Sequence, residues 1–216
     1  MKTIKTLVTA AVVFACVVSF SATAKPVNIT PNVASVEITV DGKKFTIERN
    51  QDNKNLIDSN YAKTSRPCPP FCIRPIVLAP GVETIGELEL IEYLKQLDGD
   101  KNIMVIDSRT PDWVARGTIA GAVNIPWTGL DAKKGATELD IELIVVDEFG
   151  AEKEDGKWDF SNAKTLVLFC NGMWCGQSPR NIMSLLALGY PAEKLKWYRG
   201  GMQTWHVLGL STVMPK

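Results

Sequence analysis

Two cysteines and a serine lie close together between a run of apolar residues and a helical pattern. Cys170 directly follows the apolar residues 166–169, Cys175 comes five residues later, and Ser178-Pro179 precedes apolar residues at helical spacing. An unbroken apolar run of this length is typical of a strand buried on both faces. A hydroxyl residue followed by proline is typical of a helix start, with the serine as N-cap. The spacing therefore predicts a strand, a short loop that begins at Cys170, and a helix.

This order of elements predicts a reactive thiolate at Cys170. A sulfur at a strand end that faces a helix N-terminus lies among unpaired N–H donors and the positive end of the helix dipole. Both favour the thiolate, which is the nucleophilic form of cysteine. Gly172 and Gly176 let the loop curl so that several amides converge on one anionic centre. The alternative is that Cys170 is a buried structural cysteine. The loop glycines, the second cysteine and the predicted helix cap argue against this alternative.

The first 24 residues have the pattern of a secretory signal peptide. Lys2 and Lys5 form a positive region, residues 7–20 are apolar, and residues 22–24 are a small-x-small cleavage site. We therefore expect an exported protein, periplasmic in a bacterium, without a membrane span in the mature chain. The 24 basic and 24 acidic residues become 22 and 24 without the two leader lysines, a formal charge of −2. No basic cluster remains, so nucleic acid is not an expected partner.

The mature chain keeps its cysteines as two close pairs, Cys68 with Cys72 and Cys170 with Cys175. An even number in an exported protein favours disulfides, but such close pairs restrain little chain, which favours a chemical role for at least one pair. Cys68 and Cys72 can form a small disulfide loop, remain a dithiol, or contribute to a metal site. A zinc site needs two further ligands, and His206 is the single histidine. We therefore predict neither a metal nor a cofactor.

A length of 216 residues with 45% apolar content is typical of one globular domain, or of one domain with an appendage. Alternating apolar residues on both sides of Asp41-Gly42 predict a β-hairpin within residues 33–49. From residue 80, strand and helix patterns alternate, which predicts an α/β fold with a parallel sheet and helices on both faces. The predicted regions are the signal peptide at 1–24, an extension at 25–79 with the hairpin and a Cys-Pro-rich connector, and the α/β domain at 80–216.

Individual elements follow from the same patterns, and one of them carries the candidate nucleophile. The expected strands lie at 81–83, 103–106, 122–125, 166–169 and 196–198. The expected helices are one capped by Thr84, a turn at 111–116, and helices at 139–146, 179–188 and 202–208, with a polar loop at 152–159. In parallel sheets, reactive sites lie beyond the carboxyl ends of the strands, which is where Cys170 falls.

Three segments of the chain resemble the signatures of the rhodanese-like domain family. They are residues 105–109 with 117–126, residues 168–170 with the following loop, and residues 198–210. Together they extend over the region from residue 80 to about 213. The resemblance implies a small α/β sulfurtransferase fold in which Cys170 carries a persulfide. It is nearest to exported single-domain rhodaneses with a C-x-G-x-x-C loop.

The sequence departs from the family pattern in three places. Thr118 replaces the usual histidine, at a position generally linked to structure. The loop continues to Ser178 and includes Cys175, so it is longer than the common rhodanese loop. The related phosphatases with a Cys-x5-Arg loop are excluded, because residue 176 is glycine and Arg180 lies beyond the proline. Residues before 80 match nothing in the family pattern.

The resemblance implies a two-step transfer. The Cys170 thiolate attacks a thiosulfate-type donor and expels sulfite, and the persulfide then passes its sulfur to cyanide, a thiol or an exported protein. Loop amides would hold the anion, and Arg180 and Arg109 are candidates for attracting it. As alternatives, Arg180 is a solvated helix residue and Arg109 ties down a loop beside Asp107. The predicted substrate-binding residues are Asn171, Gly172, Met173, Trp174, Cys175, Gly176, Gln177, Ser178, Arg180 and Arg109.

Two other functions stay open. Cys175 can resolve a persulfide or sulfenate on Cys170 by forming a loop disulfide, which would make the protein a thiol–disulfide switch. Alternatively, the protein is a persulfide-carrying or peptide-binding module whose amino-terminal hairpin docks a partner.

Overall fold

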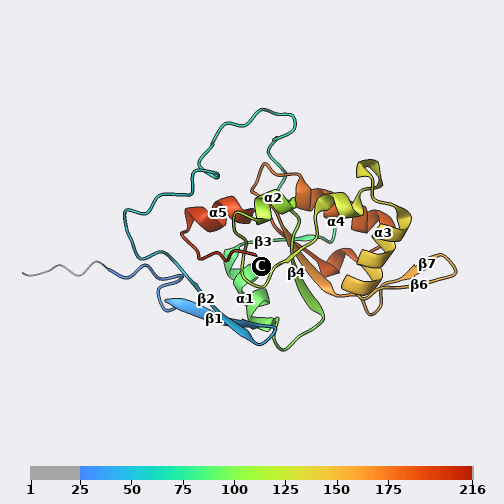
Figure 1. Cartoon of the computed structure of the whole chain (residues 1–216), viewed down its shortest axis with the longest axis horizontal. Coiled ribbons are helices and arrows are strands. Elements are labelled where there is room, and N and C mark those ends of the chain that lie inside the picture. Colours follow the sequence, from blue (N-terminus) through green and yellow to red (C-terminus); the bar gives the residue numbers. More distant parts are fainter. Residues whose placement is uncertain (1–24, 216) are drawn as a thin grey trace, which may run out of the picture.

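The computed structural model describes residues 25–215, and the predicted signal peptide lies outside these residues. Its centre is a five-stranded sheet in the order β3-β9-β8-β4-β5, in which all neighbouring strands are parallel (Figure 1). The strands are β3 (Glu83–Ile85), β4 (Ile103–Asp107), β5 (Val123–Asn124), β8 (Thr165–Phe169) and β9 (Leu195–Tyr198). The predicted parallel sheet is confirmed, with β8 at its middle.

Helices cover both faces of this sheet, as predicted (Figure 1). They are α1 (Glu87–Gln96), α2 (Pro111–Val114), α3 (Glu138–Leu143), α4 (Gln177–Leu188) and α5 (Gly201–Val207). Alternate side chains of β8 point to opposite faces. Val167 and Phe169 pack with α1 and α5, whereas Leu166 and Leu168 pack with α4 and with the π-helix Ile144–Glu148 that follows α3. All four are fully buried, which explains why the run is apolar throughout.

The predicted amino-terminal hairpin is also confirmed. Strands β1 (Ser35–Val40) and β2 (Lys43–Glu48) pair antiparallel around Asp41-Gly42, whose φ angles of 49° and 73° give the turn its favoured twist. Ile38 and Ile47 are buried in the same core as α1. The hairpin therefore extends the hydrophobic core on the α1 face.

The connector after the hairpin packs against the α/β domain. Tyr61 is buried, and its ring stacks on His206 of α5 with centroids 4.5 Å apart. Farther along, the Arg74 N–H donates to the carbonyl of Met173 at 2.9 Å. The connector thus returns to the loop that follows β8, above the carboxyl end of the sheet (Figure 1).

Three element predictions were wrong. The strand expected at 81–83 lies at Glu83–Ile85 instead. Thr84 does not cap α1, because β3 continues to Ile85 beside β9. The helix begins after Gly86, whose N–H donates to the Glu89 carboxylate at 3.1 Å. The polar segment expected as a loop forms a hairpin instead, with strands β6 (Glu152–Glu154) and β7 (Lys157–Asp159).

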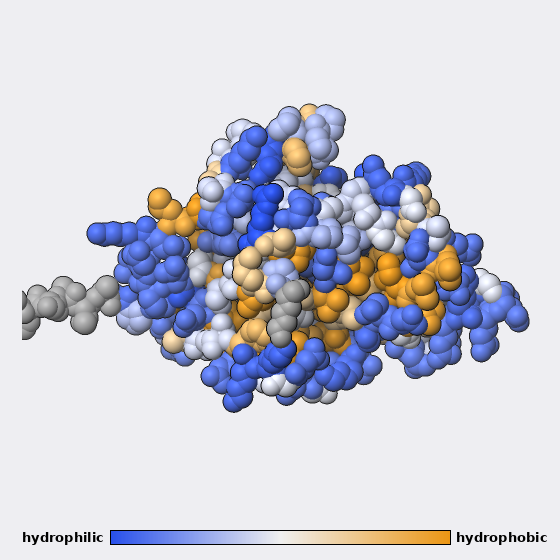
Figure 2. Space-filling model, in the orientation of Figure 1, coloured by the Kyte–Doolittle hydropathy of each residue, from blue (hydrophilic) through white to orange (hydrophobic). Residues whose placement is uncertain are grey.

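Figure 2 shows apolar surface near the position of α3. Leu139 and Leu143 of that helix are exposed. Among residues 25–215, no helix has the length and hydropathy required to cross a membrane.

Candidate active site

Cys170 lies directly after β8, at the carboxyl end of the central strand, and is almost completely buried. Its carbonyl accepts a hydrogen bond of 2.9 Å from the N–H of Met202 at the start of α5. Gly201 makes this approach possible, because its φ is +55° and a Cβ there would overlap the Cys170 carbonyl oxygen. The backbone around the cysteine is therefore fixed by the N-terminus of α5.

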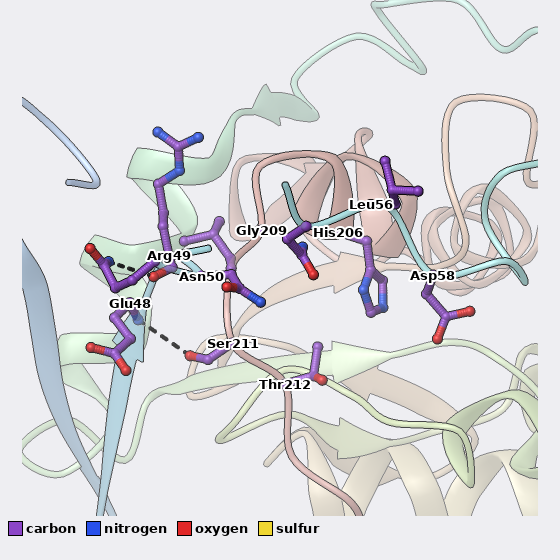
Figure 3. Close-up of a pocket in the computed structure, with 12 residues that line it drawn as sticks. Glu48, Arg49, Asn50, Leu56, Asp58, His206, Gly209, Ser211 and Thr212 are labelled. Carbon is purple, nitrogen blue, oxygen red and sulfur yellow. Dashed lines mark hydrogen bonds between the residues drawn. The ribbon is translucent and has the colours of Figure 1, made fainter. Parts of the chain in front are cut away.

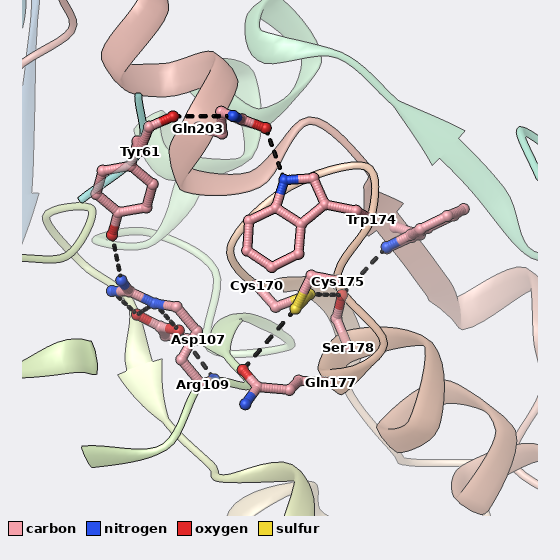
Figure 4. The surroundings of a disulfide bond; sticks show 10 residues. Tyr61, Asp107, Arg109, Cys170, Trp174, Cys175, Gln177, Ser178 and Gln203 are labelled. Carbon is pink, nitrogen blue, oxygen red and sulfur yellow. Dashed lines mark hydrogen bonds and ion pairs between the residues drawn. A yellow bond between two sulfur atoms is a disulfide. The ribbon is translucent and has the colours of Figure 1, made fainter. Parts of the chain in front are cut away.

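Cys170 and Cys175 form a disulfide across the loop, with Cα atoms 6.4 Å apart (Figure 4). The loop closes through a hydrogen bond of 2.8 Å from the Cys175 N–H to the carbonyl of Gly172. Both cysteines are nearly buried. Since a nucleophilic thiolate requires a free sulfur, this disulfide must be reduced before Cys170 can attack a substrate.

Ser178 contacts the Cys170 sulfur, a role that differs from the predicted helix cap. The α4 helix starts at Gln177 with Gly176 as N-cap, so Ser178 already lies within the first turn. Its hydroxyl donates to Cys170 Sγ at 3.1 Å and accepts from the Trp197 indole N–H at 3.2 Å. An indole N–H can only donate, so the serine uses an oxygen lone pair for Trp197 and its own hydrogen for the sulfur.

The loop amides are largely unengaged. Within residues 25–215, the N–H groups of residues 171–174 and 176–178 have no hydrogen-bond acceptor, whereas that of Cys175 donates to Gly172. Such amides at the start of α4 are suited to an anion, and the helix dipole adds to the effect.

A cavity of about 380 Å³ opens beside the loop, between the connector and α4. Cys175, Gly176 and Gln177 form part of its wall, but Cys170 does not line it. Its lining contains no carboxylate. The basic and aromatic side chains around it are Arg66, Arg74, Lys134, Arg180, Trp113, Trp127 and Trp174, with Phe71. The cavity is therefore both cationic and aromatic.

The connector supplies one wall of this cavity, which the sequence did not reveal. The Arg66 guanidinium lies over the Trp174 ring, 3.9 Å from its centroid, and Phe71 packs edge-on against the same ring at 5.5 Å. Arg74 lies so close to Gly176 that a Cβ there would contact its guanidinium. The Cys68–Cys72 disulfide lies within this segment, with Cα atoms 4.6 Å apart. We call residues 66–74 the connector wall.

The family model for the rhodanese-like domain matches residues 90–207. The chain belongs to the rhodanese-like domain family.

Similar solved structures include a rhodanese-related protein from Thermoplasma volcanium, at 20% identity and TM-score 0.37, covering 62% of this chain and 99% of that chain. The human single-domain sulfurtransferase TSTD1 is 23% identical, with TM-score 0.33 and coverage of 57% and 95%. The As-Sb reductase from Leishmania major is 24% identical, with TM-score 0.39 and coverage of 58% and 78%. The sequence matches none of the curated proteins with which it was compared.

Arg109 does not reach the cavity of this rhodanese-like domain. Its side chain is fully buried and forms an ion pair with Asp107 at 2.6 Å (Figure 4). It also donates to the Tyr61 hydroxyl at 2.8 Å, and the Thr118 hydroxyl donates to Asp107 at 2.7 Å. Its candidate role in attracting an anion is therefore not supported, and the geometry fits the alternative of a structural tie beside Asp107.

Arg180, in contrast, lines the cavity. Its guanidinium lies 5.1 Å from the Trp127 ring centroid and pairs with Asp131 at 3.1 Å, and its side chain is about half exposed.

The Trp174 indole donates to Gln203 at 2.9 Å, so this loop residue is anchored to α5 (Figure 4). Met173 points to solvent.

A second cavity, of about 500 Å³, lies between the connector and α5 and contains no cysteine in its wall (Figure 3). His206 lines it, and burial lowers the pKa of this imidazole from its usual value. The histidine stacks on Tyr61, and the lining of this cavity shares no residue with that of the first. This cavity is therefore separate from the candidate active site.

Proposed function

We propose that the protein is a sulfurtransferase that moves a sulfane sulfur from a thiosulfate-type donor to a thiophilic acceptor through a persulfide on Cys170. The observation that carries this proposal is the surroundings of the sulfur. Cys170 follows the central strand, accepts a hydrogen bond from the Ser178 hydroxyl, and begins a loop whose amides are mostly unengaged. Membership of the rhodanese-like domain family supports the same chemistry.

The transfer takes two displacements at sulfur. In the reduced protein, the Cys170 thiolate attacks the outer sulfur of thiosulfate, the S–S bond of the donor breaks, and sulfite leaves with the bonding electron pair. An acceptor nucleophile then attacks the outer sulfur of the Cys170 persulfide, and the thiolate is regenerated. No net redox agent is required, and the sequence of steps predicts ping-pong kinetics.

The protein assists both displacements electrostatically. The Ser178 hydroxyl and the free loop amides stabilise negative charge on Cys170 and on the bound donor. The four basic side chains of the cavity attract an anionic donor toward the loop. Arg180 is the only one of these four that sequence reasoning had assigned to the site.

The loop disulfide favours a second candidate function, a thiol–disulfide switch. The Cys175 thiolate can attack the inner sulfur of the Cys170 persulfide, which forms the disulfide and releases hydrosulfide. The pairing of Cys170 with Cys175 in the structure supports this candidate. Such a protein would release its sulfur without an external acceptor.

Sulfur transfer from thiosulfate to cyanide tests the proposal directly. We expect turnover by the reduced protein, loss of turnover in Cys170→Ser, and retained turnover in Cys175→Ser. Loss in both variants, together with hydrosulfide release, would instead support the switch. Full turnover in Cys170→Ser would contradict both functions.

We also propose that the protein works after export, with residues 25–79 as an extension of the α/β domain. The leader pattern and two disulfides support this location, because disulfides persist in exported proteins. We expect cell fractionation to recover the protein outside the cytoplasm, with an amino-terminal sequence that begins near Lys25. A cytoplasmic protein with an uncleaved leader would contradict it.

A further inference from the structure

The two sulfurs of the loop disulfide have different surroundings. Cys175 belongs to the wall of the cationic cavity, with the Gln177 carbonyl oxygen 3.9 Å from its sulfur. Cys170 is buried to the same extent as Cys175 but does not line the cavity. A nucleophile that enters the cavity therefore meets the Cys175 sulfur first.

The surroundings of the Cys170 sulfur favour its departure as a thiolate. When a disulfide is attacked at one sulfur, the other departs as a thiolate, and a leaving thiol of lower pKa departs faster. The Ser178 hydroxyl already donates to Cys170, and the Trp197 indole orients that hydroxyl. All three residues are buried, so the hydrogen bonds act where solvent does not compete. Cys175 has no such hydroxyl donor within residues 25–215.

We propose that, in the oxidised protein, an anionic organic thiol attacks the Cys175 sulfur and displaces Cys170 as a thiolate. The S–S bond between the two cysteines breaks, and a new S–S bond joins the incoming sulfur to Cys175. The incoming thiolate sulfur is oxidised, the Cys170 sulfur is reduced, and the loop disulfide is the only oxidant. This exchange goes beyond the proposed sulfur transfer, because the attacked sulfur belongs to Cys175 and the protein is in its oxidised state.

The cavity defines the class of thiol. Four basic side chains and no carboxylate line it, so an anion is favoured over a neutral or cationic thiol. The Nε atoms of Arg66 and Arg74 and the indole nitrogen of Trp127 are buried without a hydrogen-bond acceptor in the described region. A volume of about 380 Å³ is also large enough for an organic molecule bigger than thiosulfate. A thiol that carries a carboxylate or sulfonate fits these features.

The position of attack can be read by mass spectrometry. The full mature chain is oxidised, treated briefly with 2-mercaptoethanesulfonate, quenched with N-ethylmaleimide, and analysed by fragment-ion mass spectrometry. We expect the mixed disulfide on Cys175 and the maleimide on Cys170. The reverse assignment, an equal mixture, or failure of the oxidised protein to form the Cys170–Cys175 disulfide would overturn the proposal. No sulfur donor is present, so the outcome is independent of thiosulfate turnover.

The charge preference has its own test. The rate at which a thiol opens the Cys170–Cys175 disulfide is measured for 2-mercaptoethanesulfonate, 2-mercaptoethanol and cysteamine. Each rate is divided by the rate of the same thiol with a neutral model disulfide. We expect the anionic thiol to react about tenfold faster than the cationic one at low salt, with the preference falling as salt rises. Arg74→Gln should reduce this preference, whereas Lys44→Gln on the hairpin should leave it unchanged. Equal corrected rates for the three thiols would overturn the assigned class.

Discussion

At the scale of single residues, the hydrogen bond from Ser178 to the Cys170 sulfur is the contact that distinguishes the two loop cysteines. A donor to a thiolate stabilises the charged form, which is the form that reacts. In a reduced Cys175→Ser background, Ser178→Ala should slow alkylation of Cys170 at neutral pH about tenfold, in line with the loss of a charge-assisted hydrogen bond. Ser184→Ala, on the same helix, is the matched control. An unchanged alkylation rate in Ser178→Ala would show that the serine does not act on the thiolate.

Arg109 illustrates a residue whose role is stability. Its guanidinium and the Asp107 carboxylate are both buried. Arg109→Leu leaves that carboxylate without its partner, which should cost about 3–5 kcal/mol of unfolding free energy. Denaturant titration measures this loss. The double variant with Asp107→Asn should recover part of it, and a neutral Arg109→Leu single variant would contradict the assignment.

At the scale of elements, the strand–loop–helix unit around Cys170 was predictable because its signals are local. The apolar run of β8 and the helical spacing of α4 depend on neighbouring residues only. The error at Ser178 has a physical reason. The serine hydroxyl forms hydrogen bonds with the Cys170 sulfur and the Trp197 indole instead of capping the helix. Thr84 was misassigned because pairing of β3 with β9, between residues distant in sequence, extends the strand past it.

The junction between the loop and α5 supports a further prediction. Gly201 has a positive φ and lies against the Cys170 carbonyl, so Gly201→Ala must displace the loop or the helix. We expect a loss of at least about 2 kcal/mol of unfolding free energy, from strain and overlap together. Gly99→Ala, where a Cβ meets nothing within 4 Å, should be nearly neutral. Equal stability of the two variants would refute the tight junction.

At the scale of the whole molecule, the extension completes the cavity of the α/β domain. Arg66 and Phe71 hold Trp174 from one side, and Tyr61 contacts both Arg109 and His206 from another. The sequence predicted a connector in this region but not where it packs, because a proline-rich polar segment has no periodicity that points to its contacts. The hairpin before it was predictable from the Asp41-Gly42 turn alone.

Removal of the connector disulfide tests this arrangement. The double substitution Cys68→Ser with Cys72→Ser should loosen the connector wall and raise the KM for an anionic donor severalfold, with little change in kcat. The reason is that the wall carries two guanidinium groups but not the nucleophile. Both proteins carry Cys175→Ser and are assayed without a reductant, so that Cys170 stays free while the Cys68–Cys72 disulfide is kept where its cysteines are present. The same pair assayed after reduction, when neither protein holds the disulfide, is the control. A fall in kcat with unchanged KM would contradict the assignment of the wall to binding.

The central claim is that Cys170 carries the transferred sulfur. The reduced mature protein is mixed with thiosulfate in the absence of an acceptor, and intact mass with fragment-ion mass spectrometry locates any added sulfur. The account predicts one added sulfur atom on Cys170 in Cys175→Ser and none in Cys170→Ser. An added sulfur on Cys175, or none on any cysteine while sulfite is released, would contradict it.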